Sequence, residues 1–158
     1  MYFCIKQISK MEKVDFTIAI LSNKTPEVIY QTLLDVRSWW WGLYGVEFTG
    51  NSENADDVFT IKAGDGAHYS EHKLVELIPG KKIVWLVTEA NLAFLENKKE
   101  WVGTKLIFEI SEKGERSEVK FIHEGLTPAS ECYDSCAPTW TQYLQTKLFP
   151  LLNDKRDS

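Results

Sequence analysis

A change of hydrophobic period near the end of the chain limits the possible folds more than any other feature. From Pro138 onward, side chains recur at the spacing of one helix face, whereas the chain before it alternates in short strand-like runs. Pro150 is expected to end or kink this helix near Phe149, because proline has no N–H to donate. The chain therefore needs a fold in which a long final helix covers a sheet. The helical stripe consists of Trp140, Tyr143, Leu144, Lys147, Leu148 and Leu151.

Seven strands are predicted ahead of this helix, most of them separated by turns that contain glycine. They span residues 14–21, 44–49, 58–63, 68–77, 82–88, 104–111 and 117–124. In three of these strands, alternation of polar and apolar residues assigns one face to the interior. In the strand of residues 68–77, both faces mix polar and apolar side chains, so its register stays open. The inward residues are Ile83, Trp85, Val87, Leu106, Phe108, Ile110, Val119, Phe121 and His123.

Two short helices are predicted between the first two strands. Thr25 is a suitable N-cap and Pro26 suits the first helical position, so a helix should run from Pro26 to Leu34. Three consecutive tryptophans, residues 39–41, then form a short turn or second helix and need apolar cover. The buried stripe of the first helix is predicted to be Val28, Ile29, Leu33 and Val36.

The order of these elements predicts one α+β domain with a helix-grip fold. A curved antiparallel seven-stranded sheet would wrap around the long C-terminal helix, and the two short helices after strand 1 would close one end. A length of 158 residues suits a single domain with one core. We expect residues 1–13 to be an N-terminal extension, residues 14–152 the folded domain and residues 153–158 a solvated tail.

Charge and hydropathy exclude several classes of function. The net charge of −5, without a dense cluster of Lys or Arg, argues against nucleic acid as a partner. No apolar run approaches the roughly 20 residues of a spanning helix, so no membrane insertion is expected. The N-terminus has no secretory pattern, which favours a cytoplasmic location. Reduced thiols are expected for Cys4, Cys132 and Cys136, whose spacing fits neither a disulfide framework nor a zinc site.

Four motifs in a fixed order span nearly all of residues 14–152. They are Thr25-Pro-Glu-Val with Ser38-Trp-Trp, Val75-Glu-Leu-Ile-Pro-Gly-Lys-Lys-Ile-Val-Trp, Phe121-Ile-His-Glu-Gly-Leu, and Trp140 with Leu144 and Leu148. Together they resemble the START-like (SRPBCC) superfamily, in the branch of homologues of the heat-shock-protein ATPase activator. The match looks closer to uncharacterised bacterial members, through Glu100-Trp-Val-Gly-Thr and Glu131-Cys-Tyr-Asp-Ser-Cys. The resemblance implies this fold with an internal cavity, and a chaperone as an alternative partner.

A set of aromatic residues is the candidate ligand site, because aromatic walls bury the apolar surface of a ligand with few polar contacts. Each of these residues alone also suits plain core packing. His123 is a candidate polar anchor or general acid/base, and alternatively a core histidine satisfied by neighbouring groups. The cavity set is Trp39, Trp40, Trp85, Trp101, Phe108, Phe121, His123, Trp140, Tyr143 and Leu144.

Metal and cofactor chemistry find little support in the sequence. His68 and His72 share a strand face, but about 13 Å along the strand is too wide for one ion. The chain contains no nucleophile motif and no phosphate-binding glycine loop. We therefore expect no metal and no cofactor, and assign no catalytic residue.

The leading functional hypothesis is a non-enzymatic domain that binds a small hydrophobic or amphipathic molecule between the sheet and the final helix. Two alternatives stay open. One is a protein-interaction domain of the co-chaperone, ATPase-activator kind, which the resemblance implies. The other is an enzyme of the cyclase or dehydratase kind that uses His123, with Glu71 or Tyr69 as a second group.

Overall fold

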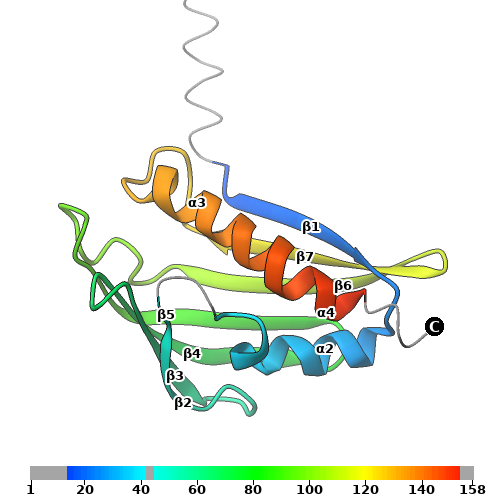
Figure 1. The fold of residues 1–158 in the computed structure, drawn as a ribbon. Coiled ribbons are helices and arrows are strands. Elements are labelled where there is room, and N and C mark those ends of the chain that lie inside the picture. Colours follow the sequence, from blue (N-terminus) through cyan, green and yellow to red (C-terminus); the bar gives the residue numbers. More distant parts are fainter. Residues whose placement is uncertain (1–13, 42–44, 154–158) are drawn as a thin grey trace, which may run out of the picture.

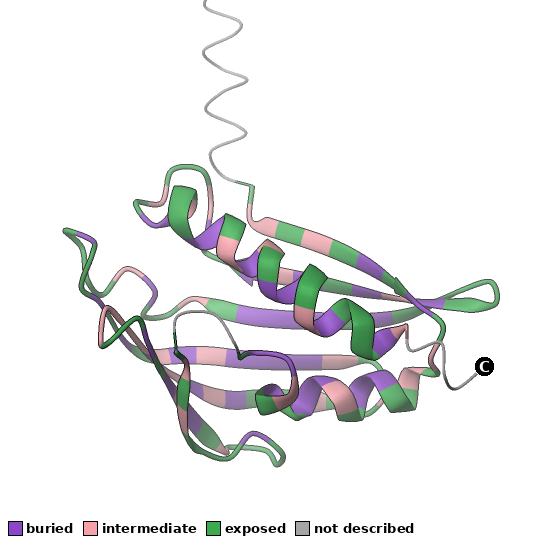
Figure 2. Ribbon diagram, in the orientation of Figure 1, coloured by how far each residue is buried: buried purple, intermediate pink, exposed green. Residues whose placement is uncertain are grey.

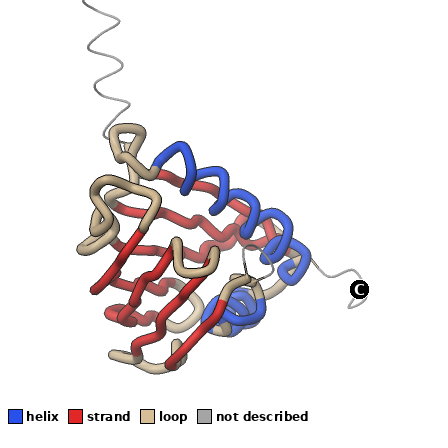
Figure 3. The backbone as a smooth tube through the Cα atoms, turned by 60° about the vertical axis from the view of Figure 1, so that its left-hand side comes forward, coloured by secondary structure: helices blue, strands red, loops and turns tan. Residues whose placement is uncertain are grey.

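The described residues of the computed structural model, 14–41 and 45–153, form one antiparallel sheet and a long C-terminal helix that lies across it (Figure 1). The strand order is β1-β7-β6-β5-β4-β3-β2. Figure 3 shows the helices on one side of the curved strands, so the predicted α+β helix-grip fold is confirmed. The elements are β1 (Phe16–Ser22), α2 (Pro26–Leu34), η1 (Val36–Ser38), β2 (Glu47–Gly50), β3 (Val58–Ala63), β4 (His68–Ile78), β5 (Lys82–Leu92), β6 (Lys105–Lys113), β7 (Arg116–Glu124), α3 (Tyr133–Gln142), η2 (Tyr143–Leu148) and α4 (Phe149–Leu152).

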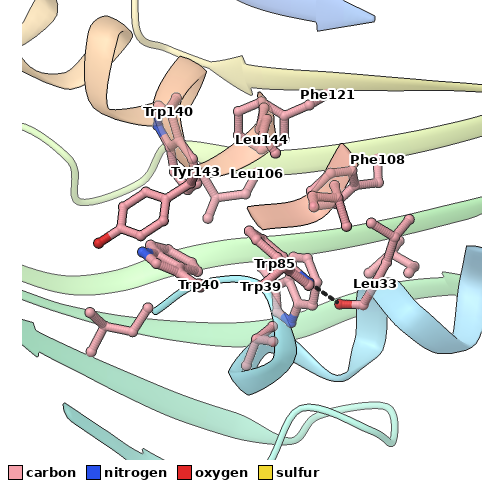
Figure 4. Packing of buried hydrophobic residues seen from close by; sticks show 14 of the residues in the cluster. Leu33, Trp39, Trp40, Trp85, Leu106, Phe108, Phe121, Trp140, Tyr143 and Leu144 are labelled. Carbon is pink, nitrogen blue, oxygen red and sulfur yellow. Dashed lines mark hydrogen bonds between the residues drawn. The ribbon is translucent and has the colours of Figure 1, made fainter. Parts of the chain in front are cut away.

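The core lies between the concave face of the sheet and the final helix (Figure 2). The faces of β5, β6 and β7 that alternation assigned to the interior are buried, which confirms those three assignments. Trp39, Trp85 and Phe108 fill the centre through edge-to-face contacts, with the ring of Phe108 5.6 Å from Trp39 and 5.9 Å from Trp85 (Figure 4). Such offset geometry suits the aromatic quadrupoles.

Helix α2 spans the predicted residues Pro26–Leu34, and its N-cap forms as predicted. The Thr25 hydroxyl accepts a hydrogen bond from the Val28 N–H at 3.3 Å. The predicted buried stripe was wrong at Val28, which is 46% exposed, and Tyr30 and Leu34 are buried in its place. The helix packs on β5, β6 and α4 together. The face that it buries is therefore rotated relative to the face that the hydrophobic period alone suggests.

The final helix differs from its prediction at both proline residues. It begins at Tyr133 and contains Pro138, which was expected to open it. The carbonyl that Pro138 leaves without a donor, four residues back, belongs to exposed Asp134, where water can bind it. Pro150 does not end the helix either, because the preceding turns widen to π-helical geometry over η2 and α4 follows.

The open register of β4 has a structural cause. Its pairing with β5 shifts between Glu71 and His72 and again between Leu74 and Glu76, so simple alternation fails along this strand. The inward side chains Ser70, His72 and Leu74 are fully buried.

The predicted ends of the domain are tested only in part. Residues 1–13 and 154–158 lie outside the described residues, as does the start of the predicted strand at 44–49. Asn153, predicted as the first residue of the solvated tail, donates from its side-chain amide to the Leu21 carbonyl at 2.9 Å. The end of the final helix is therefore tied to β1.

Gly50 and Gly114 both have left-handed backbones, but we expect them to differ in their tolerance of a side chain. Gly50 has φ +86°, and a Cβ there would lie 2.1 Å from the Val58 carbonyl oxygen, whereas Gly114 has φ +66° and open space around it. We expect Gly114→Ala to lower the free energy of unfolding by about 1 kcal/mol through backbone strain, and Gly50→Ala by about 2–4 kcal/mol. Urea unfolding measures both, and equal losses would contradict the close approach of β2 and β3.

Candidate functional site

A cavity of about 690 Å³ lies where α3 crosses the end of the sheet, beside the turn that joins β3 to β4. This volume falls within the range of pockets that hold small molecules. None of the described residues that line it carries a charge. The lining residues are Trp40, Ile61, Ala63, Gly64, Ala67, His68, Phe94, Trp101, Ser135, Cys136, Pro138, Thr139, Trp140, Gln142 and Tyr143.

Four of the ten residues predicted for the site line this cavity: Trp40, Trp101, Trp140 and Tyr143. Trp140 is the centre of the wall, since its ring lies 4.8 Å from that of Trp40 and stacks at 6.1 Å on Trp101 with planes only 8° apart. Figure 4 shows Trp40, Trp140 and Tyr143 close together at one end of the core. The other six pack in the core without lining the cavity: Trp39, Trp85, Phe108, Phe121, His123 and Leu144.

The lining residues that sequence reasoning missed are mostly small. Ala63 ends β3, Gly64 and Ala67 lie in the β3–β4 turn, and Thr139 belongs to α3. The sequence identified this segment only as a turn. A cluster of small residues opposite bulky aromatics is a signal for a void, but it appears only once the turn and the helix are placed together.

His123 forms the centre of a buried chain of hydrogen bonds behind the cavity wall. The Trp140 indole N–H donates to Nδ1 of His123 at 3.1 Å, and Nε2 of His123 lies 2.9 Å from the Thr104 hydroxyl. That hydroxyl donates in turn to the Trp101 carbonyl at 2.7 Å. Because Nδ1 accepts and the Thr104 proton is used, the Nε2 of His123 carries its proton and donates to Thr104.

Both nitrogens of His123 are therefore engaged, and neither is free to exchange a proton with a ligand. The arrangement matches the alternative of a core histidine satisfied by its neighbours. The chain links β7 and α3 to the segment between β5 and β6 that carries Trp101 and Thr104. It thus fixes the orientation of the Trp140 ring and the backbone position of Trp101, two residues that line the cavity.

His68 and His72 lie on the same face of β4 but in different surroundings. His68 lines the cavity, with its Nε2 2.8 Å from the Ser70 hydroxyl and its ring edge-on to Trp101 at 4.9 Å. His72 is fully buried, and its Nδ1 lies 3.3 Å from the Phe59 carbonyl. No group of three or more His, Cys, Asp or Glu side chains suited to a metal occurs in residues 14–41 and 45–153.

Burial keeps all three histidines neutral near pH 7. Desolvation lowers the pKa of His68 to about 4, and lowers the pKa of His72 and of His123 to about 3, with a smaller contribution from the nearby His68. Charging any of them inside this apolar cluster is unfavourable. The cavity region therefore presents uncharged imidazoles to its contents.

Two glutamates hold the loops beside the cavity against each other. The Glu131 carboxylate accepts the backbone N–H groups of Asn97 and Glu96 at 2.9 and 2.7 Å, which lowers the pKa of Glu131. In return the Glu100 carboxylate accepts the N–H groups of Glu131 and Cys132 at 2.7 and 2.9 Å. This reciprocal clamp joins the loop that carries Trp101 to the start of the final helix.

The expectation of reduced thiols was wrong for one pair. Cys132 and Cys136 are joined as a disulfide, with Cα atoms 5.5 Å apart, a separation that such bonds span readily. Their i, i+4 spacing brings the two thiols together at the start of α3. The sequence offered no means of distinguishing two neighbouring thiols from a bonded pair.

The tryptophans of residues 39–41 are divided between core and surface. Trp39 and Trp40 are buried, as predicted, but Trp41 is 47% exposed. The ammonium group of Lys147 lies 3.8 Å from the ring centroid of Trp41, a cation–π contact that gives this ring partial cover.

Solved structures with the same fold were found, although no protein-family model and no curated protein sequence matches the chain. The Aha1 dimer from Colwellia psychrerythraea is 22% identical over 88% of this chain and 96% of that chain, with a TM-score of 0.67. A protein from Mycobacterium smegmatis is 10% identical over 92% of this chain and 94% of that chain, also at 0.67. An HSP90 activator from Plasmodium falciparum is 17% identical over 87% and 92%, at 0.54.

At these identities the likeness establishes the fold. The chain has the helix-grip fold, which it shares with the Aha1 dimer and the HSP90 activator, and this confirms the fold that the resemblance in the sequence motifs implied. None of the helices in the described part of the chain is long and apolar enough to cross a membrane.

The neutral histidines predict a loss of stability in mild acid. In the unfolded chain a histidine takes up a proton near pH 6.5, whereas in the folded chain these three do so only near pH 3–4. Unfolding therefore takes up protons between pH 6.5 and about 4, and stability falls as the pH falls. Each such histidine adds a slope of about 1.4 kcal/mol per pH unit.

Urea unfolding between pH 7.5 and 5 measures this slope. We expect about 1.4–4 kcal/mol per pH unit below pH 6, corresponding to one to three protons. Most of this window lies above the range in which carboxylates titrate. A stability that stays flat from pH 7 to 5 would show that the histidines are not buried in neutral form.

Breaking the hydrogen-bond chain with one isosteric substitution should also lower the free energy of unfolding. Thr104→Val leaves the Nε2–H of His123 without a partner and removes one of the two hydrogen bonds to the Trp101 carbonyl, which keeps the one from the backbone N–H of residue 104, so we expect a loss of about 1–3 kcal/mol in unfolding free energy. Thr17→Val, at an exposed threonine of β1, is the matched control and should change stability by less than about 0.5 kcal/mol. Equal effects of the two substitutions would rule out a structural role for the chain.

Proposed function

We propose that this protein binds a small apolar or amphipathic molecule in the cavity beneath the start of α3. The observation that carries the proposal is a cavity of about 690 Å³ whose described lining is rich in aromatic side chains and free of charge. Burial of apolar ligand surface there contributes about 2.5 kcal/mol for each 100 Å². Because the hydrogen-bond chain and the glutamate clamp hold the walls in place, little of that energy is lost to reorganisation.

The geometry favours binding over catalysis. The enzyme alternative depends on His123 as acid or base, but Trp140 and Thr104 occupy both of its ring nitrogens. Glu71, proposed as a second group, accepts a hydrogen bond from the Thr88 hydroxyl at 2.8 Å and does not line the cavity. The described cavity therefore lacks the pair of titrating groups that a cyclase or dehydratase of the proposed kind would use.

A chaperone-activating role is the second candidate. It is favoured by the likeness in fold to a protein named as an HSP90 activator, and by the half-exposed Trp41 beside Lys147 on the outer surface. Addition of the purified protein to a chaperone ATPase assay tests it. Stimulation that Trp41→Ala removes would support this candidate, and unchanged turnover would end it.

Compartment and domain limits are also proposals. We propose a cytoplasmic location and a folded domain of residues 14–152. Thiol alkylation before and after reduction, on protein from fractionated cells, tests the location and the disulfide of Cys132 and Cys136 together.

Filling the cavity should abolish binding. Ala67 lies on the β3–β4 turn and lines the cavity, so Ala67→Phe would place a ring in the space for a ligand. We expect titration with the uncharged dye Nile red to show saturable binding to the natural protein, and at least about tenfold weaker binding to Ala67→Phe, since a ring's volume is lost.

The matched control is Ala19→Phe, the same change at an exposed position of β1. It should bind the dye like the natural protein. Equal affinity of Ala67→Phe and the natural protein would place the dye outside the cavity. Native mass spectrometry of freshly purified protein then shows whether a cellular molecule occupies the site.

A further inference from the structure

The cavity offers a ligand very few polar contacts, and most of its polar side chains are engaged or lie at the rim. Thr139 donates to the Ser135 carbonyl at 2.8 Å, and Ser135 and Gln142 are exposed. Two buried nitrogens near the cavity, Nε2 of His72 and Nε1 of Trp101, have no partner in the described structure, but protein atoms enclose both. Neither is open to a molecule inside the cavity.

His68 differs from these groups. Its Nε2 meets Ser70, while its Nδ1 has no partner among the described residues and is not enclosed in the way that the His72 nitrogen is. His68 lines the cavity and is only partly buried. Its second ring nitrogen is thus a polar atom of a lining residue that is available to a ligand.

Ser70 determines what this nitrogen can do. Its hydroxyl is fully buried, and within the described residues its proton has one acceptor, Nε2 of His68. A buried hydroxyl without an acceptor is costly, so Ser70 donates and Nε2 accepts. In neutral imidazole the proton then sits on Nδ1, so His68 presents an N–H donor to the cavity.

We propose that the ligand is an uncharged, flat aromatic molecule with an acceptor oxygen that receives the Nδ1–H of His68. This inference rests on the proposed binding function and specifies the ligand class. The nearly parallel rings of Trp101 and Trp140 supply flat apolar surface. A charged ligand is disfavoured, because no described lining residue carries a compensating charge.

The tautomer is tested without any ligand. Long-range proton–nitrogen NMR correlation on the labelled protein at pH 7.5 distinguishes the two forms of each histidine. We expect His68 to carry its proton on Nδ1 and His123 on Nε2, so the two rings act as internal controls for each other. A proton on Nε2 of His68 would overturn the assignment of a donor to the cavity.

Ligand class is tested with three probes of similar shape. 2-Acetylnaphthalene carries an acceptor oxygen, 2-ethylnaphthalene lacks it, and 2-naphthoate carries a charge. Calorimetry gives the affinity of each for the natural protein, His68→Phe and Tyr69→Phe. The phenylalanine at position 68 keeps an aromatic ring against Trp101, and Tyr69 on the same strand lies outside the cavity lining.

We expect the ratio of ketone to hydrocarbon affinity to fall about three- to tenfold in His68→Phe and to stay unchanged in Tyr69→Phe, as the loss of one hydrogen bond implies. Naphthoate should bind more weakly than the ketone. Should His68→Phe fail to fold, Ser70→Ala keeps the imidazole and removes its proton donor, and the ratio should fall there as well.

The outcomes separate this inference from the proposed function. Binding of both neutral probes with a ratio that His68→Phe leaves unchanged would overturn the anchor and keep the binding function. Naphthoate bound as tightly as the ketone would overturn the requirement for an uncharged ligand. No binding of any probe, with Nile red also excluded, would overturn both.

Discussion

The hydrogen-bond chain from Trp140 through His123 and Thr104 to the Trp101 carbonyl is the interaction on which the cavity depends. Each polar atom in the chain has a partner, and a buried network of this kind is strong only when it is complete. It connects the final helix to the end of β7 and to the segment between β5 and β6. Trp140, whose ring it orients, could otherwise turn into the empty space and close it.

The same chain limits the chemistry of the site. It engages both nitrogens of His123, and the burial that makes the chain favourable also lowers the histidine pKa values to about 3–4. Three imidazoles in one region would suggest catalysis or a metal from their number alone. Their environment instead keeps them neutral, and of these three imidazoles only His68 has a nitrogen that is neither paired within the described residues nor enclosed.

The parts of the fold that could be predicted are those with local causes. The cap at Thr25 marked the start of α2, and alternation gave the inward faces of β5–β7. Tertiary packing decides the rest. The register of β4 could not be predicted because the strand contains bulges, and the prediction was wrong at Pro138, which the helix tolerates because the carbonyl it leaves unpaired belongs to exposed Asp134. The aromatic wall was visible in the sequence, but the position of the cavity depends on small residues from separate segments, which no single stretch of sequence brings together.

The location of the cavity follows from side-chain size. At the centre of the sheet, Trp39, Trp85 and Phe108 fill the space under the final helix, whereas Ala63 and Ala67 at the β3–β4 turn cannot reach the start of that helix. An unfilled apolar space costs stability and tends to collapse. Here the glutamate clamp and the hydrogen-bond chain both act at its edges and keep it open. Residues that keep a space open against the tendency of a core to pack are typical of functional sites. For this reason we assign the function to the cavity and not to the rest of the core, which is better packed.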